Sequence, residues 1–189
     1  MKIEKIVVGP LSTNCYLVFS DKEAIIIDPG DEAEKILKVI EKNKVKPKYI
    51  VLTHYHFDHI LAVEELREKT KAEVLIHEAE KKFIDFKVDK FLKEGDKIKI
   101  DNYSLRVIHT PGHSKGSICL LGKNEIFVGD LIFKNGYGRT DLPGGSNKDL
   151  ERSLKRIYKL FKKGMVIYPG HQEEFKFEDN LKNEIVFSF

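Results

Sequence analysis

The segment THYHFDH, residues 53–59, places several metal-binding side chain types at very short spacing. His54, His56, Asp58 and His59 fall within six positions, although the whole chain has only seven histidines. Imidazole nitrogens and carboxylate oxygens are ligands for zinc, iron and manganese. His54 and His56 project to the same side of an extended chain and can bind one metal ion. Asp58 and His59 follow as the chain turns into a helix, so they point elsewhere and predict a second metal ion nearby.

Three more ligand-type residues follow β-type runs and sit beside Gly or Pro, as ligands on tight strand-end turns do. They are His113 in TPGHS, Asp130 in VGD and His171 in PGH. A carboxylate such as Asp130 can bridge two metal ions. A structural metal site is typically closed, four-coordinate and rich in Cys, whereas this set contains no Cys. The residues therefore predict a catalytic centre with two divalent metal ions.

The other histidines and the two cysteines are expected to be structural. His77 ends the apolar run VLIH and His109 lies in SLRVIHT, so we interpret both as packing residues, with support of a metal ligand as the alternative. Cys15 and Cys119 lie in NCYLVF and SICLLG. Buried thiols of this kind act as small hydrophobic side chains.

Short apolar runs separated by turn residues predict strands that position the ligands. The runs are KIEKIVV, NCYLVF, EAIIID, KYIVL, AEVLIH, DKIKI, SLRVIHT, SICLLG, EIFVG and MVIY. The order IIIDPGD, helix, YIVL, TH resembles the order IFVGD, helix, MVIY, PGH. We interpret this repeated order of elements as two βαβ-containing halves whose strand ends meet at one edge, with chance similarity as the alternative.

Helices are predicted in three places. One follows IIIDPGD, with Asp31 as its N-cap and Glu34 completing a capping box. A second is expected to carry ILAVEEL, directly after THYHFDH. The third, over 146–163, has its apolar residues on one face and Ser146 or Asn147 as its cap.

Length and composition predict one domain over residues 1–189. No linker or low-complexity tract divides the chain, and 189 residues suffice for a full core. The net charge of +3 is too small to indicate nucleic-acid binding. No apolar run is long enough to cross a membrane, and no secretory signal is recognisable, so we expect a cytoplasmic protein without a membrane partner.

THYHFDH, TPGHS, GD and PGH, in this order and with these gaps, resemble the metallo-β-lactamase superfamily over nearly the whole chain. The resemblance implies an α/β fold, a four-layer αβ/βα sandwich. It also implies a ligand set for each metal ion. The first set is His54, His56 and His113, the second is Asp58, His59 and His171, and Asp130 bridges the two.

TNCYLV, TPGHSKGSICL and GDLIFKNGYGRTDLPGGS are similar to the glyoxalase II-like hydroxyacylglutathione hydrolases, in particular to a short single-domain subgroup. The resemblance implies hydrolysis of a small-molecule thioester such as S-lactoylglutathione. The cofactors would be two divalent ions, with zinc favoured and iron or manganese as alternatives. Two such ions can share a water, lower its pKa and present a bound hydroxide to the thioester carbonyl.

The resemblance also implies roles for three residues around this chemistry. Asp58 is the candidate proton acceptor, with bound water as the alternative. Arg139 occupies the position of a basic residue near the carboxylate of the thiol carrier, although a pair between Arg139 and Asp141 is the alternative. Tyr137 is expected to line the substrate pocket.

Several departures from the family pattern bear on the substrate. The chain is expected to lack the C-terminal helical domain that supplies glutathione-binding residues. Asp141 stands where an aromatic residue is common, and Gln172 replaces the usual Gly after the last metal-binding His. Leu61 and Ala62 replace a pair of small residues. A thiol carrier other than glutathione therefore stays open.

Parts of the sequence also resemble four other classes of protein. A mononuclear iron persulfide dioxygenase shares the GRTD stretch but uses only ligands of the His54, His113 and Asp130 type. A lactonase-type or β-lactamase-like hydrolase disagrees with GRTDLPGGS, a nuclease with the mild charge, and a non-catalytic metal domain with the absence of Cys ligands. The residues do not predict an oligomeric state.

Overall fold

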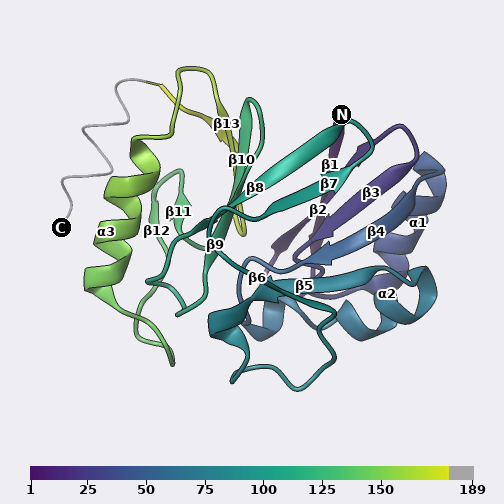
Figure 1. Cartoon of the computed structure of the whole chain (residues 1–189), viewed down its shortest axis with the longest axis horizontal. Coiled ribbons are helices and arrows are strands. Elements are labelled where there is room, and N and C mark those ends of the chain that lie inside the picture. Colours follow the sequence, from purple (N-terminus) through teal and green to yellow (C-terminus); the bar gives the residue numbers. More distant parts are fainter. Residues whose placement is uncertain (179–189) are drawn as a thin grey trace.

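The computed structural model describes residues 1–178, and two six-stranded sheets pack face to face in it (Figure 1). In spatial order, the first sheet contains β1 (Lys2–Val8), β2 (Thr13–Ser20), β3 (Glu23–Ile27), β4 (Lys46–Val51), β5 (Glu73–His77) and β6 (Lys90–Leu92). The second contains β14 (Phe175–Lys176), β13 (Val166–Pro169), β10 (Glu125–Gly129), β9 (Ile118–Leu121), β8 (Tyr103–His109) and β7 (Lys97–Ile100). A small hairpin pairs β11 (Ile132–Phe133) with β12 (Gly136–Tyr137).

Helices complete the outer layers. α1 (Ala33–Asn43) and α2 (Val63–Thr70) cover the first sheet, and α3 (Asn147–Tyr158) covers the second (Figure 1). Three apolar clusters fill the spaces between the resulting four layers. The predicted four-layer αβ/βα sandwich is therefore confirmed.

The central strands explain why the apolar runs in the sequence are continuous. Along β2, Leu17 faces the cluster under α1 and α2, whereas Val18 faces the cluster between the sheets. Ile26 and Ile25 of β3 divide in the same way. Because successive side chains of a strand point to opposite faces, a strand covered on both faces is apolar at every position.

The predicted repeated order of elements corresponds to two parallel β-α-β units. β3, α1 and β4 form one, and β10, α3 and β13 form the other. His54 follows β4 and His171 follows β13. The order of elements in the two halves is therefore the same, as expected.

The first helix begins later than its predicted cap. Asp31 was expected as the N-cap, but α1 starts at Ala33 with Glu32 as its N-cap, in the left-handed region at φ 49° and without a side-chain cap bond. The reason is local, since Asp31 Oδ1 accepts from the Glu32 backbone N–H at 2.7 Å instead. The Glu32 carboxylate is drawn to the Gly9 N–H, at 3.1 Å.

The other helices were predicted with errors at their ends. α2 begins at Val63, so Ile60 lies outside it, after a 3-10 turn η1 (Phe57–His59). α3 ends at Tyr158 rather than at 163, whereas its predicted cap is confirmed: Ser146 Oγ accepts from Asp149 N at 3.2 Å. The short strands β6, β11, β12 and β14 were not predicted, because two or three residues carry no recognisable alternation.

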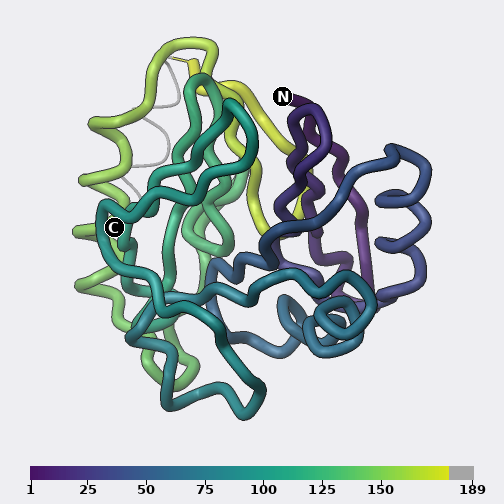
Figure 2. Tube along the Cα trace, turned by 45° about the vertical axis from the view of Figure 1, so that its right-hand side comes forward, coloured from purple at the N-terminus to yellow at the C-terminus, as the bar shows by residue number. Residues whose placement is uncertain are grey.

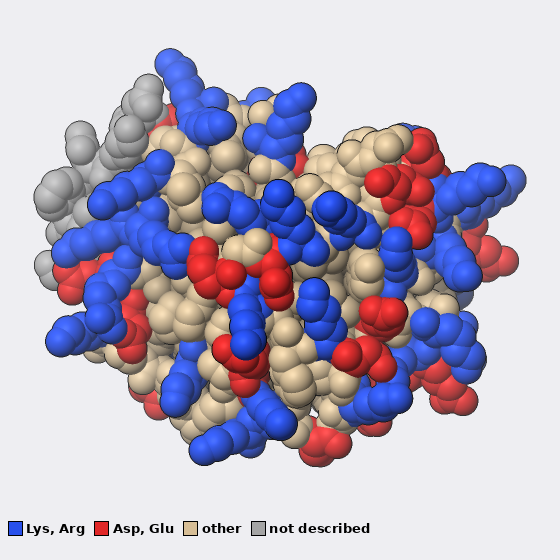
Figure 3. Space-filling model, viewed as in Figure 1, with Lys and Arg blue, Asp and Glu red and all other residues tan. Residues whose placement is uncertain are grey.

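Charges on the face shown in Figure 3 are well mixed, with Lys and Arg side chains interspersed among Asp and Glu. This fits the small net charge of +3. None of the helices in residues 1–178 is both long and apolar enough to cross a membrane.

Candidate metal centre

The end of β13 in the second sheet is tied to β2 of the first sheet beside the centre. The purple N-terminal strands and the yellow C-terminal segment lie side by side in Figure 2. Asn14 N donates to the Gly170 carbonyl at 2.7 Å, and Tyr16 OH donates to the Pro169 carbonyl at 2.6 Å. These bonds fix the PGH turn, and His171 with it, against β2.

The structure brings the seven predicted ligands together at this edge, in two sets. In the first set, potential ligand atoms of His54, His56 and His113 all lie within 4.8 Å of one another. In the second set, those of Asp58 and His59 in or beside η1, and of His171, satisfy the same limit. Each set offers three ligands, which suits a catalytic metal ion with an open position.

Asp130 lies between the two sets. Its Oδ2 is 3.6 Å from His113 Nε2 in the first set and 3.5 Å from His171 Nε2 in the second. Its Oδ1 is 3.5 Å from His59 Nε2. The carboxylate therefore faces ligand nitrogens of both sets, which is the position that a bridging ligand requires.

Four histidines are oriented by a hydrogen bond from Nδ1 to an oxygen. The acceptors are Thr53 Oγ1 for His54 (3.0 Å), Asp28 Oδ2 for His59 (3.1 Å), the Arg139 carbonyl for His113 (2.7 Å) and the Leu11 carbonyl for His171 (3.1 Å). Each bond places the ring proton on Nδ1 and leaves the Nε2 lone pair for a metal ion. His56 differs, because its Nδ1 faces His113 Nε2 at 2.8 Å.

Orphaned polar atoms show that the residues fit a metal centre. His54 Nε2, His56 Nε2, His59 Nε2 and Asp130 Oδ1 are buried and have no hydrogen-bond partner among the described residues. A buried polar atom without a partner costs about 1–3 kcal/mol. Bound cations would satisfy all four of these clustered atoms.

The protonation of the first set suits metal binding. Burial, and then the charge of neighbouring histidines, lowers the pKa of His54 well below its ordinary value and that of His56 to about 4. Burial also lowers the pKa of His113. These rings stay neutral near pH 7, the form in which imidazole binds a metal ion.

In the second set the carboxylates dominate. Burial disfavours the charged form of His59, but Asp130 and Asp28 outweigh it and raise the pKa of His59 to about 9. Burial is likewise outweighed at His171, whose pKa is raised by Asp58 and Asp130. The acidic groups thus attract positive charge here, and metal binding would release the protons.

Asp28 supports the centre, and the sequence had not assigned it to the site. It lies within the same distance limit of His54 and His59, but it already accepts from the Thr53 N–H and Oγ1, both at 2.7 Å, and from His59. Its lone pairs are occupied, so it orients the histidines rather than binding a metal ion. The sequence signal that could have identified Asp28 is its position at the end of the apolar run IIID.

A cavity of about 500 Å³ opens beside the metal centre. His56, Asp58, His113, Asp130 and His171 contribute to its wall. The rest of the wall is mostly apolar and consists of Leu11, Tyr55, Phe57, Ile60, Phe83, Leu142 and Pro143, together with Arg139. A small molecule held there would reach the metal ions with its reactive group, while apolar side chains surround the remainder.

Two predicted substrate residues are placed differently. Arg139 lines the cavity, but its guanidinium is paired with Asp141. This pair is the alternative that the sequence had left open for Arg139. Tyr137 is not among the residues that line the cavity, and it is 38% exposed at the end of β12. Tyr137 is carried by the β11–β12 hairpin, which the sequence did not predict, and its role at the pocket stays a prediction.

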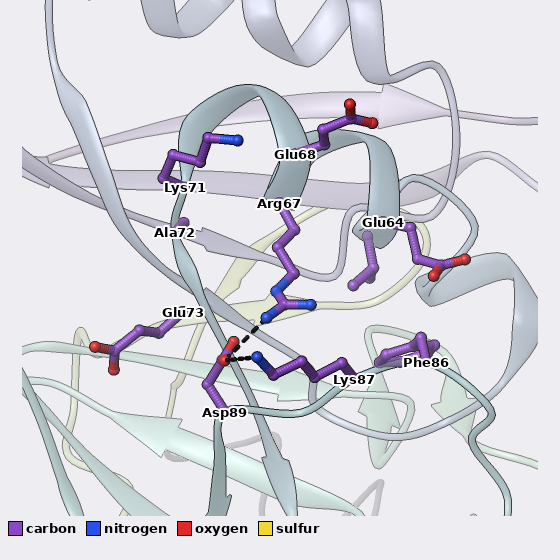
Figure 4. Close-up of a pocket in the computed structure, with 10 residues that line it drawn as sticks. Glu64, Arg67, Glu68, Lys71, Ala72, Glu73, Phe86, Lys87 and Asp89 are labelled. Atoms are coloured by element: carbon purple, nitrogen blue, oxygen red, sulfur yellow. Dashed lines mark hydrogen bonds and ion pairs between the residues drawn. The ribbon is translucent and has the colours of Figure 1, made fainter.

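Another cavity, of about 400 Å³, lies along α2 and the segment before β6 (Figure 4). Its Arg67 and Lys87 both pair with Asp89, at 3.0 and 3.9 Å. None of the predicted metal ligands lines it. Its lining contains no histidine or cysteine.

His77 and His109 lie outside the metal ligand sets and stack on each other, with ring centroids 4.1 Å apart. The stacking agrees with the interpretation of both as packing residues. Cys15 and Cys119 are fully buried free thiols, also as predicted.

His77 is expected to make stability depend on pH. Burial, and then His109, lowers its pKa to about 4, whereas an unfolded His has a pKa near 6.5. The unfolded chain therefore binds the extra proton first, so stability present above pH 6.5 is lost as the pH falls toward 4.

Replacing His77 by Phe keeps an aromatic ring for stacking and removes the titration. Urea unfolding at pH 7.5 and 5.0 should show that the variant loses about 1–2 kcal/mol less than the wild type over this interval. Equal losses in the two proteins would contradict the assignment.

Comparisons with known proteins agree with the fold. The chain belongs to the metallo-beta-lactamase superfamily, which it matches over residues 8–171. It is 35% identical to the probable metallo-hydrolase YqgX of Bacillus subtilis, over 92% of either chain. It is 33% identical to the hydroxyacylglutathione hydrolase GloC of Haemophilus influenzae, over 90% of this chain and 91% of GloC.

Two solved structures have the same fold. The BLEG-1 B3 metallo-beta-lactamase superposes with a TM-score of 0.88 at 31% identity, over 93% of this chain and 94% of that one. TTHA1623, solved in a di-iron-bound form, gives 0.83 at 33% identity, over 92% and 94%. With its His and Asp ligand sets, this chain is a metal-dependent hydrolase of the superfamily.

Proposed function

We propose that this protein hydrolyses thioesters at a centre of two divalent metal ions, with hydroxyacyl thioesters such as S-lactoylglutathione as the substrates to test first. The observation that carries the proposal is the position of Asp130, within 3.6 Å of ligand nitrogens from both three-ligand sets. The similarity to GloC of Haemophilus influenzae supports the thioester.

Each ligand set has a part in the chemistry. One ion would be held by His54, His56 and His113. The other would be held by Asp58, His59 and His171, and Asp130 would contact both ions. When bound, the two ions supply a water of lowered pKa as the nucleophile and a Lewis acid for the carbonyl. Zinc, iron and manganese all suit these nitrogen and oxygen ligands.

Asp58 is suited to accept a proton. Its Oδ2 accepts from Thr13 Oγ1 at 3.0 Å and lies 3.2 Å from His171 Nε2. Although burial opposes ionisation, His171 and His59 hold the pKa of Asp58 well below its usual range. Asp58 therefore stays a carboxylate at neutral pH. In this form its Oδ2 can orient a proton donor and accept the proton.

The cavity beside the metal centre suits the rest of a thioester substrate. Tyr55 and Phe83 stack at 4.5 Å between ring centroids, and Tyr55 OH donates to the Pro143 carbonyl at 2.8 Å. These contacts give the cavity a rigid apolar wall that excludes water. The leaving thiolate needs little protonation, because a thiol pKa is about 8.5.

Metal content and hydrolysis measured on one sample test the proposal. Protein purified without added metal should contain about two metal ions per chain and hydrolyse S-lactoylglutathione. Two ions with hydrolysis of lactones or β-lactams, and of no thioester, would replace the substrate class. One iron per chain, with oxygen consumption on glutathione persulfide and no hydrolysis, would replace the proposal by a persulfide dioxygenase.

A further inference from the structure

One buried acid from the first sheet holds the loop that carries His113. Glu80 lies in the 3-10 turn η2 (Glu78–Glu80), directly after β5, and its side chain is fully buried. Its Oε1 accepts from the Ser114 hydroxyl and from the Gly116 N–H, the latter at 2.7 Å. Both donors belong to the segment between β8 and β9 of the second sheet. Glu80 therefore joins a turn of one sheet to a ligand loop of the other.

The loop around His113 is closed on itself through the same serine. Ser114 Oγ lies 2.7 Å from Ser117 Oγ, which accepts from the Ser114 N–H at 3.0 Å. The Thr110 N–H donates to the Ser117 carbonyl at 2.8 Å. Because Ser114 follows His113 directly, the contact with Glu80 fixes the backbone from which the His113 ring projects.

Glu80 and the loop pack without spare room. A Cβ built on Gly116 would lie 2.7 Å from Glu80 Cγ and 2.9 Å from its Cδ, so the close approach requires a glycine. Glu80 Oε2 is buried and has no hydrogen-bond partner among the described residues, which costs about 1–3 kcal/mol. An apolar side chain would avoid this cost but could not accept from Ser114 and Gly116.

The same turn orders one wall of the substrate cavity. The Phe83 N–H donates to the Glu80 carbonyl at 2.8 Å. Phe83 lines the cavity, where its ring stacks on Tyr55. The backbone of Glu80 thus supports the cavity wall, while its side chain supports the loop of His113.

We infer that Glu80 is a positioning residue for the metal centre, whose carboxyl group holds the segment from Ser114 to Gly116 so that His113 is presented to a metal ion. The inference rests on the two-ion centre of the proposed function. It adds a residue outside both ligand sets, which acts through the backbone of the loop rather than by binding a metal ion.

Zinc titration against a competing chelator, on protein prepared free of metal, tests the inference. Glu80→Ala removes both bonds and should weaken the binding of one of the two ions about tenfold, as loss of a group that orients a ligand does. Glu80→Gln keeps an acceptor oxygen and should bind both ions like the wild type. Burial raises the pKa of Glu80, so a neutral amide suits its surroundings. Ser114→Ala removes one bond, leaves Glu80 in place and should weaken the same ion, so the test does not depend on the folding of Glu80→Ala.

Glu125 is the matched control, because it is also a buried glutamate that accepts several hydrogen bonds. It lies at the start of β10, and Asp130 follows the other end of that strand. Its acceptor bonds come from Tyr103 OH and two backbone N–H groups. Glu125→Ala should destabilise the metal-free protein, as Glu80→Ala should, but leave zinc binding unchanged. Equal zinc affinities in these two variants would overturn the inference, because the effect would then be one of stability alone.

Amide hydrogen exchange of the metal-free proteins gives a readout that does not depend on zinc. The Gly116 N–H should exchange faster, relative to the amides of β9 in the same protein, in Glu80→Ala but not in Glu80→Gln or Glu125→Ala. Unchanged protection in Glu80→Ala would show that Glu80 does not hold the loop. If the wild type binds fewer than two zinc ions and hydrolyses no thioester, the proposed function fails, while this exchange still decides whether Glu80 holds the loop of His113.

Discussion

Replacing Asp130 by Asn is expected to lower the metal content from about two ions per chain to one or fewer, and kcat/KM by more than a hundredfold. Asn keeps the size of the side chain but has one neutral oxygen instead of a charged pair. Asp130 approaches His59, His113 and His171 with its two oxygens, so the change weakens both metal positions at once. Loss of a supporting group behind a ligand already costs about 10–100-fold, and a shared ligand should cost more.

The measurement is elemental analysis after dialysis against a graded series of chelator concentrations, with thioester hydrolysis on the same samples. The control is Asp21→Asn, an exposed residue in the turn between β2 and β3, at the other end of the strand from Asp28. Asn tolerates the left-handed backbone found there, at φ 44°. An Asp130→Asn protein that keeps two ions and near-normal hydrolysis would show that Asp130 does not bridge.

The sequence predicted well that these seven side chains converge, because each carries a local signal. Each ligand-type residue follows a β-type run, and the strand ends of an α/β sandwich meet at one edge. THYHFDH, His113, Asp130 and His171 were therefore expected to lie close together. Their ligand roles remain part of the proposal, whereas their convergence is a property of the fold.

What the sequence did not predict depends on contacts between distant segments. Asp28 orients His59 across the first sheet, and Asn14 and Tyr16 hold the turn before His171. None of these pairings has a fixed spacing along the chain. The N-cap at Asp31 failed for a similar reason, because its neighbour Glu32 bonds to Gly9, 23 residues away. The hairpin that carries Tyr137 was missed because a two-residue strand gives too short a pattern to recognise.

A methyl group at Gly30 is expected to destabilise the protein by about 3 kcal/mol, at the upper end of the range for overpacking a tight site, and to weaken metal binding as well. A Cβ built on Gly30 would lie 1.7 Å from the Asp58 carbonyl oxygen and 2.7 Å from the Asp58 carbonyl carbon. Both atoms belong to the backbone of η1, so no side-chain rotation relieves the clash. Gly30 does not have a positive φ, so the cost is steric rather than conformational.

The two loops that clash have little freedom to separate. His59, next to the clash, is fully buried and bonded to Asp28, which precedes Gly30 by two residues. Ala62 N donates to the Pro29 carbonyl at 3.1 Å and joins the same loops a second time. Relief of the clash must therefore move Asp58 and His59, two of the three ligands in the second set. That coupling is why Gly30→Ala should affect metal binding as well as stability.

Thermal unfolding of the metal-free proteins and metal titration of each variant separate the two effects. Gly30→Ala should lower Tm by about 6–12 °C for a chain of this length. Gly164→Ala is the control, because its φ is +78° but no atom lies within 4 Å of the added Cβ. It should cost only about 1–2 kcal/mol of backbone strain and leave metal affinity unchanged. Equal metal affinity in the two variants would show that the loop of Gly30 does not position the second set of ligands.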